Sequence, residues 1–317
     1  MADVTDRLFE IFFPYADRRI KEAASDSNVD FVHYTSADAA MKIIQSQSWW
    51  LRSSSIMNDF QEVSYGIARM NEAEKECGDC FRDALEAICP GLYGETQQEL
   101  AAWKLRFFND TFLASFSAHH RDKEDGIGRL SMWRAYGGEA SVAIILNKDI
   151  FLGVREDLKI YGSPVAYFDK EATLEAYREV VRNIVNHAEF LRQQSREQLR
   201  TSLYNFYRFA ILSIKHPGFK EEQEWRIVHS PQLDLNAPLV YETRSIGGLP
   251  QPIVVVPFCG NTASITGIRF SDLFDRLIIG PTEYPHALRE AFVDLLGRAG
   301  VQSPQEKIVI SDIPIRT

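Results

Sequence analysis

The stretch "FKEEQEWRIVHS", residues 219–230, decides how the fold is read, because charged and apolar side chains alternate along it. Successive side chains of a β-strand point to opposite faces of the sheet. Read as a strand, the stretch places Glu222, Glu224 and Arg226 on one face, and Trp225 and Ile227 on the other. Two like charges on one face cost free energy unless an arginine or a ligand offsets them. The alternation therefore predicts either a solvated sheet face or a charged binding site.

A second strand with one polar face is predicted earlier in the chain, in "FVHYTS", residues 31–36. His33 and Thr35 share one face of it, and Tyr34 lies on the other. The strand leads into a helix that Thr35 or Ser36 can cap. We therefore expect the polar faces of the two strands to enclose one ligand cleft. The pattern leaves open that both polar faces meet water instead, as in many antiparallel sheets.

The remaining strands and helices follow one another without regular βαβ alternation. Short apolar runs predict strands in "SWWLRSS", "TFLASFS", "ASVAIILN", "SPVAYF", "PIVVVPF", "RLIIGP" and "KIVISD". Helical periodicity marks an N-terminal helix within residues 1–28, helical insertions at 62–108 and 170–215, and a helix at 286–298. This order predicts an α+β fold with a mixed, mainly antiparallel sheet. No linker is evident, so residues 1–317 are expected to form a single domain.

Composition narrows the class of protein. The chain has 317 residues with ordinary globular composition and a formal net charge of -9, which argues against an extended basic surface for duplex nucleic acid. The first residues lack the basic segment and long apolar run of a signal peptide, and no apolar run approaches the ~20 residues that span a bilayer. These features predict a cytoplasmic protein that does not use a membrane. The four cysteines are expected to be unligated thiols in a reducing compartment.

Two clusters are weak candidates for metal binding. Cys77 and Cys80 form a Cys-x-x-Cys pair, but the second pair that a zinc site needs is missing from the sequence. His119 and His120 are adjacent, and neighbouring side chains of an extended segment point apart, so they make a poor chelate. We therefore expect no metal site.

For several other polar residues, two structural roles are possible. Asn58, Asp59 and Glu62 follow a predicted strand and could face the cleft, or they could cap a turn and the next helix. Arg52 and Lys215 could meet a pyrophosphate, although exposure to solvent is the commoner fate of such side chains. The chain contains no Walker loop, no Gly-x-Gly-x-x-Gly and no nucleophile elbow, which disfavours the enzymes that use them.

An ordered set of motifs resembles a widespread bacterial family known mainly as a domain of unknown function. Its members show His-Tyr-Thr-Ser, Phe-Asn-Asp-x-x-Glu, Met-Trp-x-x-Tyr and Glu-x-Glu-Trp-Arg in this order. The corresponding segments here are "FVHYTS", "IMNDFQE", "LSMWRAYGG" and "FKEEQEWRIV", and the resemblance spans roughly residues 31–316. The sequence departs from the family at 57–60, where Met-Asn-Asp-Phe replaces Phe-Asn-Asp-Pro, which affects the expected conformation of that loop.

The start of that family is in turn similar to ADP-ribosyltransferases, including toxins that modify DNA. The resemblance implies that His33 bonds the adenosine ribose of NAD and Thr35 the nicotinamide amide. Glu224 would then stabilise the oxocarbenium-like transition state, and Glu222 would orient or deprotonate the acceptor. Tyr136 is the candidate to stack on nicotinamide. Tyr34, Arg226, Asn58 and Asp59 complete the residues expected around the cofactor, Tyr34 less so because it points to the opposite face, whereas Trp133 is expected in the core.

These resemblances imply an NAD-dependent mono-ADP-ribosyltransferase with an ADP-ribosyltransferase-like fold, in the setting of a bacterial toxin or a phage-defence effector. NAD would be the substrate, the acceptor would be a protein or a nucleic acid, and an antitoxin or defence-system partner would accompany it. Two alternatives remain: a nucleotide-binding sensory module without turnover, and a nuclease that uses His33 with the carboxylates.

Overall fold

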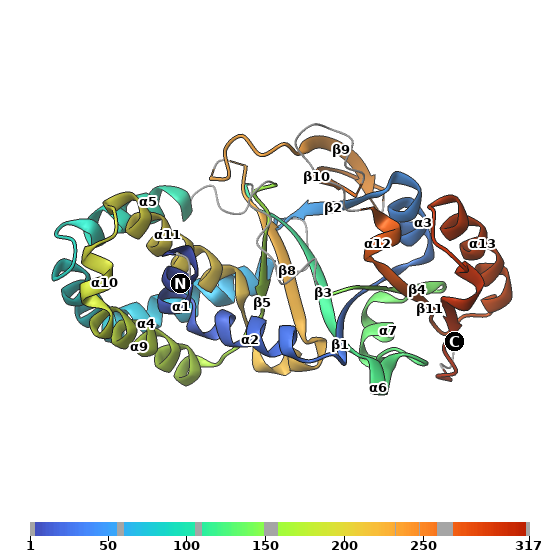
Figure 1. The fold of residues 1–317 in the computed structure, drawn as a ribbon, viewed down its shortest axis with the longest axis horizontal. Coiled ribbons are helices and arrows are strands. Elements are labelled where there is room, and N and C mark those ends of the chain that lie inside the picture. Colours follow the sequence, from blue (N-terminus) through green and yellow to red (C-terminus); the bar gives the residue numbers. More distant parts are fainter. Residues whose placement is uncertain are drawn as a thin grey trace. The chain divides into compact units, whose positions relative to one another are not determined.

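The computed structural model describes residues 4–55, 60–104, 110–148, 158–231, 233–246, 248–258 and 269–314 (Figure 1). Contacts between Cα atoms divide the chain into two compact units. Unit 1 comprises residues 1–22, 54–111 and 163–220, and unit 2 comprises 23–53, 112–162 and 221–317. The segments predicted as helical insertions thus belong, together with the N-terminal residues 1–22, to unit 1.

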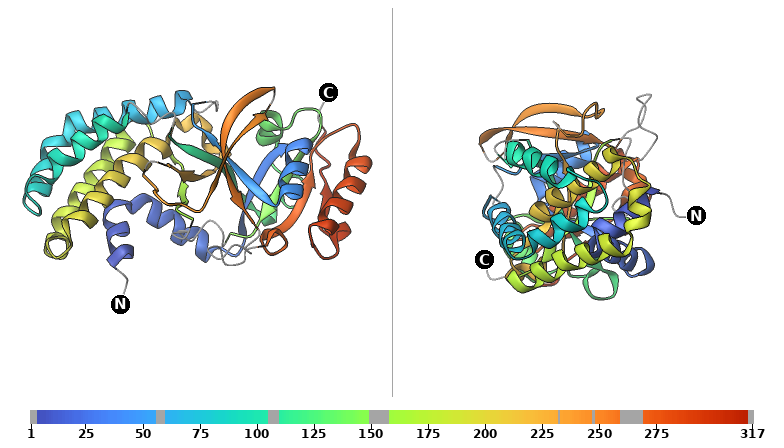
Figure 2. Two further views of the ribbon diagram at one scale, coloured as in Figure 1. Left: turned by 90° about the horizontal axis from the view of Figure 1, so that it is seen from above. Right: turned by 90° about the vertical axis from the view of Figure 1, so that its left-hand side faces the viewer.

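Unit 1 is a helical unit whose long helices lie side by side (Figure 2). Its elements are α1 (Val4–Phe12), most of α2 (Pro14–Ser25), α4 (Phe60–Glu86), α5 (Leu92–Lys104), α9 (Lys170–Asn186), α10 (Ala188–Arg192), α11 (Arg196–Ser213), and the short strands β6 (Ala166–Tyr167) and β7 (Ile214–Lys215). Pro14 ends the first helix and starts the second, as the sequence predicted, because proline is tolerated only in the first turn of a helix.

The core of unit 1 is aromatic. The ring of Phe81 on α4 contacts the rings of Tyr177 on α9 and of Phe206 and Tyr207 on α11. The carboxylate of Glu74 accepts the hydroxyls of Tyr177 at 2.7 Å and Tyr207 at 3.0 Å. Burial raises the pKa of both tyrosines, so they remain protonated donors. These bonds tie three helices to one carboxylate.

Unit 2 holds the sheet, which has ten strands in the described part of the chain. The strand order is β12-β11-β4-β1-β3-β2-β10-β9, and β8 pairs with β3 and with β5 outside this path. The strands are β1 (Val29–Ser36), β2 (Ser48–Ser53), β3 (Phe112–His120), β4 (Ser141–Leu146), β5 (Tyr161–Pro164), β8 (Glu224–His229), β9 (Val240–Ile246), β10 (Leu249–Pro257), β11 (Phe274–Ile279) and β12 (Ile308–Ile310).

Helices of unit 2 pack on this sheet. They are α3 (Ala37–Ser46), α6 (Arg121–Glu124), α7 (Leu130–Tyr136), α12 (Phe270–Leu273) and α13 (Pro285–Arg298), with the 3-10 helix η2 (Pro304–Glu306). The hydroxyl of Ser36 accepts the Ala39 N–H at 3.2 Å, so the predicted cap at the start of α3 is confirmed. Met132 and Trp133 of α7 pack on Val32 and Ala143 of the sheet.

Strand β3 is the branch point of the sheet. One of its edges pairs with β8 over residues 112–117, and its other edge pairs with β2 over 112–113 and with β1 over 117–120. At residues 114–116 this second edge has no ladder partner among the described strands. Strands β1 and β2 therefore diverge beside the middle of β3.

The predicted fold class is confirmed at the level of a mixed α+β fold with a mainly antiparallel sheet. Two of the differences from prediction concern β8 and β9. Strand β9 was not predicted, and the strand expected from Glu222 begins only at Glu224. Glu222 ends the 3-10 helix η1 (Pro217–Glu222), and Gln223 has a φ of 46°, a left-handed conformation that breaks the alternation. Glu222 therefore does not share a strand face with Glu224. Among the described helices, none combines the length and apolar composition that a bilayer crossing needs.

Candidate functional site

Glu224 and Arg226 form a buried ion pair on β8. Nε of Arg226 lies 2.7 Å from Oε1 of Glu224, and Nη2 lies 3.1 Å from Oε2. The two side chains are 5% and 1% exposed, so the pair is almost fully removed from water. Their common face was predicted from the alternation of the strand and is confirmed. A charge-assisted fork of this kind fixes the carboxylate in one orientation.

The strand register places two serines beside this pair. Ser117 of β3 lies opposite Glu224, and Ser115 lies opposite Arg226. Opposite residues of an antiparallel pair share one face, with Cβ atoms about 5 Å apart. We call this side of β1, β3 and β8 the polar face; it carries Tyr34, Ser115, Ser117, Glu224 and Arg226.

The hydroxyl of Ser115 has no hydrogen-bond partner in the described part of the chain, although its oxygen is buried. A buried hydroxyl without a partner is unfavourable by about 1–3 kcal/mol. Such an atom in a native protein calls for a reason, of which a bound ligand is one. The Ser117 hydroxyl, by contrast, lies 3.9 Å from the sulfur of Met132.

The opposite side of the same strands is aromatic. The ring of His33 lies 4.9 Å from that of Trp49 and 5.4 Å from that of Phe116, while Trp225 packs edge-on against Phe31. We call this side the aromatic face. It carries His33, Phe31, Phe116 and Trp225, joined by Trp49 of β2.

His33 lies beside the middle of β3, where β1 and β2 diverge. Its Nδ1 donates to the carbonyl of Ser115 at 3.0 Å, at the part of β3 that has no ladder partner on this edge. Burial lowers the pKa of His33 to about 4, and the bond to Ser115 offsets this only in part. The imidazole is therefore neutral at pH 7, with its proton on Nδ1.

The expectation that His33 and Glu224 enclose one cleft is not met. In β1, Val32 lies opposite Ser117, which lies opposite Glu224, so these three side chains share the polar face. His33 is the next residue after Val32 and therefore points to the aromatic face. The sequence pattern defines the face of each strand by itself, but the relative register of two strands comes from the sheet.

The other predicted site residues are distributed over several environments. Thr35 is half-buried on the same side of β1 as His33 and lies opposite Val142. Tyr34 is buried in the core against Trp133, as its position on the other face implied. Tyr136 ends α7 and is 46% exposed. Asn58 and Asp59 lie outside the described residues.

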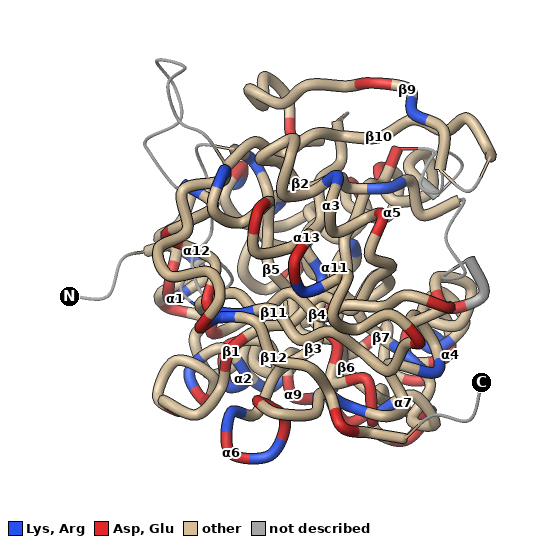
Figure 3. The backbone as a smooth tube through the Cα atoms, turned by 90° about the vertical axis from the view of Figure 1, so that its right-hand side faces the viewer, with Lys and Arg blue, Asp and Glu red and all other residues tan. Residues whose placement is uncertain are grey.

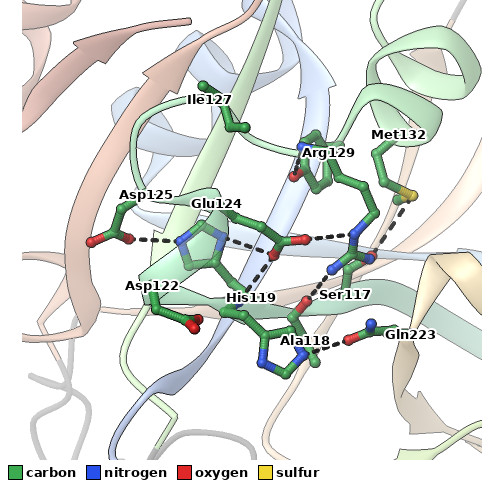
Figure 4. Close-up of polar contacts among 12 residues, drawn as sticks. Ser117, Ala118, His119, Asp122, Glu124, Asp125, Ile127, Arg129, Met132 and Gln223 are labelled. Atoms are coloured by element: carbon green, nitrogen blue, oxygen red, sulfur yellow. Dashed lines mark hydrogen bonds and ion pairs between the residues drawn. The ribbon is translucent and has the colours of Figure 1, made fainter.

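Arg129 connects β3 to the segment before Glu224, and Figure 4 shows its contacts with Glu124 and Ala118. Its Nη1 donates to the carbonyls of Glu221 at 2.8 Å and Glu222 at 3.2 Å, and its Nη2 donates to the carbonyl of Ala118 at 2.8 Å. Its Nε forms an ion pair with Glu124 at 2.7 Å. One guanidinium thus holds the backbone of residues 221–222, which leads directly into β8.

His119 completes this network on the same strand as Ser117 (Figure 4). Its buried ring bonds Oδ1 of Asp125 through Nε2 at 2.8 Å, and Asp125 pairs with Arg276 at 2.7 Å. The neighbouring His120 bonds Gln223 at 2.9 Å. The two histidines point to different partners, and within the described ranges no group of three or more His, Cys, Asp or Glu could hold a metal ion.

The structure gives the surroundings of the other residues for which the sequence analysis made a prediction. Lys215 was expected at the surface, but it is 2% exposed and pairs with Glu62 at 2.7 Å, because both lie within the helical unit 1. Nε of Arg52 donates to Gln251 at 2.9 Å. Trp133 is in the core, as predicted. Sequence reasoning missed Ser115 and Arg129, and only the "SFS" alternation of β3 could have drawn attention to the serine.

Comparison with known proteins supports one of the two resemblances. A model of the family described as "Protein of unknown function (DUF2971)" matches residues 132–227. This range holds the "MWRAY" and "EWRI" motifs, so the resemblance to a family of unknown function is confirmed there. No curated protein and no solved structure matches the chain. The similarity to ADP-ribosyltransferases thus rests on the sequence motifs alone.

Proposed function

We propose that unit 2 binds a nucleotide, with NAD as the first ligand to test, on the polar face of β3 and β8. The observation that carries the proposal is the buried, unpartnered hydroxyl of Ser115, which lies opposite Arg226 and next to the ion pair with Glu224. A ribose hydroxyl can donate to a serine oxygen or to a carboxylate and accept from a serine hydroxyl. Binding there would give the buried Ser115 hydroxyl a hydrogen-bond partner.

Arg226 has a supporting role in this proposal. Its fork orients Glu224 at 5% exposure, where an isolated ionised carboxylate would be strongly destabilised. Arg129 has a second supporting role, because it holds residues 221–222 and so sets the start of β8. The charged groups are thus preorganised before a ligand arrives.

Calorimetry with NAD, ADP-ribose and nicotinamide tests the proposal. Ser115→Ala removes one hydrogen bond and is expected to weaken NAD binding by about tenfold. Thr35→Val is the matched control, because it removes a hydroxyl from the opposite side of the neighbouring strand and should leave affinity unchanged. Absence of saturable binding by NAD and ADP-ribose, or a loss confined to Thr35→Val, contradicts the proposal.

Mono-ADP-ribosyl transfer, within an ADP-ribosyltransferase-like fold, is the second candidate function. The buried, fixed carboxylate of Glu224 favours it, because breaking the nicotinamide–ribose bond develops positive charge on the sugar. Nicotinamide would leave, and an acceptor nucleophile on a protein or nucleic acid would bond to the ribose carbon and lose its proton. A toxin or defence effector is the setting that this activity would fit, and its chemistry does not require His33.

Nicotinamide release distinguishes transfer from binding alone. With labelled NAD and cell lysate, a transferase releases nicotinamide and labels an acceptor, and Glu224→Gln lowers the rate by about 10²–10³-fold. Saturable binding without release assigns the chain to the non-catalytic alternative. The nuclease alternative needed His33 to act with the carboxylates, and the strand register separates the His33 ring from Glu224.

A further inference from the structure

Strand β9 ends the sheet order on one side and is the most exposed strand of unit 2. Five of its seven residues are exposed, including Val240 at 53% and Tyr241 at 49%. It pairs with β10 along one edge, and its other edge has no ladder partner among the described strands. A free edge presents unpaired backbone N–H and C=O groups that can accept another strand.

Two prolines of β10 indicate which groups of β9 face outward. Pro250 lies opposite Ser245, and Pro252 lies opposite Thr243. Proline has no N–H to donate, so these positions suit the widely spaced pairs in which neither residue bonds the other. The N–H and C=O groups of Thr243 and Ser245 then point to the free edge.

The sequence of β9, "VYETRSI", is complementary to itself in the antiparallel direction. With Thr243 opposite its own copy, Glu242 lies opposite Arg244 of the other strand, and Arg244 lies opposite Glu242. The same register pairs Val240 with Ile246, so that apolar residues also meet. Figure 3 shows the acidic and the basic position side by side on β9.

The side chains of Glu242 and Arg244 could make further contacts with a second copy of β9. Within one chain, Nε and Nη2 of Arg244 both reach Oε2 of Glu242, each at 2.6 Å. Oε1 of Glu242 and Nη1 of Arg244 have no partner in the described part of the chain. Across a two-fold axis these free atoms could complete a ring of four alternating charges.

We propose that two copies of this protein associate by antiparallel pairing of β9 with β9, centred on Thr243. The occupant of the edge is a second copy rather than a foreign peptide, because one register matches the charges, the apolar ends and the outward backbone groups at once. Such a pairing is isologous, as a two-fold dimer requires. A seven-residue ladder buries little area, so the dimer is weak and depends on concentration.

Sedimentation of the full chain at rising concentration, with charge variants, tests the pairing. Arg244→Glu and Glu242→Arg each place like charges opposite one another twice by symmetry and should weaken dimerisation about tenfold or more. The double swap, Glu242→Arg with Arg244→Glu, restores opposite charges in the same register and should recover dimerisation. Equal dimerisation by all four proteins, or a swap no better than the single variants, overturns the register.

Cross-linking tests the β9–β9 pairing where the dimer is too weak for sedimentation to detect. Residues in a hydrogen-bonded antiparallel pair have Cα atoms about 5.5 Å apart, which suits a disulfide. Under mild oxidation Thr243→Cys should form a covalent dimer faster than Ser245→Cys, whose copies do not face each other. Wild type controls for the native thiols, of which Cys80 is exposed. If Thr243→Cys shows no advantage over Ser245→Cys, the proposal is wrong.

Discussion

The polar and aromatic faces of β1, β3 and β8 are built from alternate residues of the same strands. The two faces differ in whether their buried side chains carry charge. On the aromatic face, His33 behaves as a core residue, neutral and enclosed by the rings of Trp49 and Phe116. On the polar face, Glu224 and Arg226 form an ion pair although their side chains are only 5% and 1% exposed. Burial alone thus does not set the charge state of a side chain; the partner on its own face does.

The largest effect should follow from breaking the ion pair of the polar face. Glu224→Ala removes both hydrogen bonds of the Arg226 fork in a buried setting and should lower the free energy of unfolding by about 3–5 kcal/mol. The combined variant Glu224→Leu with Arg226→Met removes both charges and should recover most of that loss. Urea denaturation measures both, and a loss below about 1 kcal/mol in Glu224→Ala would mean that water reaches the pair.

The aromatic face should make the free energy of unfolding depend on pH, through His33. Burial lowers the folded pKa of His33 to about 4, below its ordinary value of 6.5, so the unfolded chain takes up the proton first as the pH falls. Stability from this residue is fully present above pH 6.5 and is lost progressively towards pH 4, by about 3 kcal/mol. The His33→Gln variant should lack this part of the slope. Equal slopes in the two proteins between these pH values would contradict the buried, neutral ring.

The Arg129 network should have an intermediate effect. Arg129→Ala removes a partly buried guanidinium with four protein partners and should cost about 2–3 kcal/mol, because bonds to charged groups are each worth about 1.5–3 kcal/mol and some are replaced by water. The amide of Ala118, which donates to Gln223, should also exchange faster with solvent. Arg298→Ala, on an exposed pair with Asp294, is the control and should change stability by less than about 0.5 kcal/mol.

The smallest effect should come from the unpartnered hydroxyl. Ser115→Ala removes a buried group that makes no hydrogen bond, so stability should stay constant or rise by up to about 1 kcal/mol. Thermal unfolding without ligand measures this, and the same variant should lose the stabilisation that NAD gives to wild type. A clear destabilisation of the ligand-free protein would show that the hydroxyl has a structural partner, which removes the basis of the proposed site.

Local sequence pattern predicted much of the secondary structure. Apolar runs and alternation located β1, β3, β8 and β11, and a serine in front of an apolar helical period located the cap of α3. Strand β9 was missed because its residues are mostly exposed and carry no apolar run, although the Gly-Gly pair that follows is a hairpin signal. The start of β8 was misplaced because the left-handed Gln223 interrupts the alternation, and no glycine marks it.

The sequence by itself determined which side chains share a face within one strand, since alternation is a property of the extended backbone. Thus the pairing of Glu224 with Arg226, and the separation of His33 from Tyr34, could be read from the printed chain. Only the tertiary structure decided which faces of different strands coincide. The register of β1 and β8 on β3 depends on long-range pairing, and a shift of one residue exchanges the faces. That one step separates His33 from Glu224 and brings Ser115 to the charged pair instead.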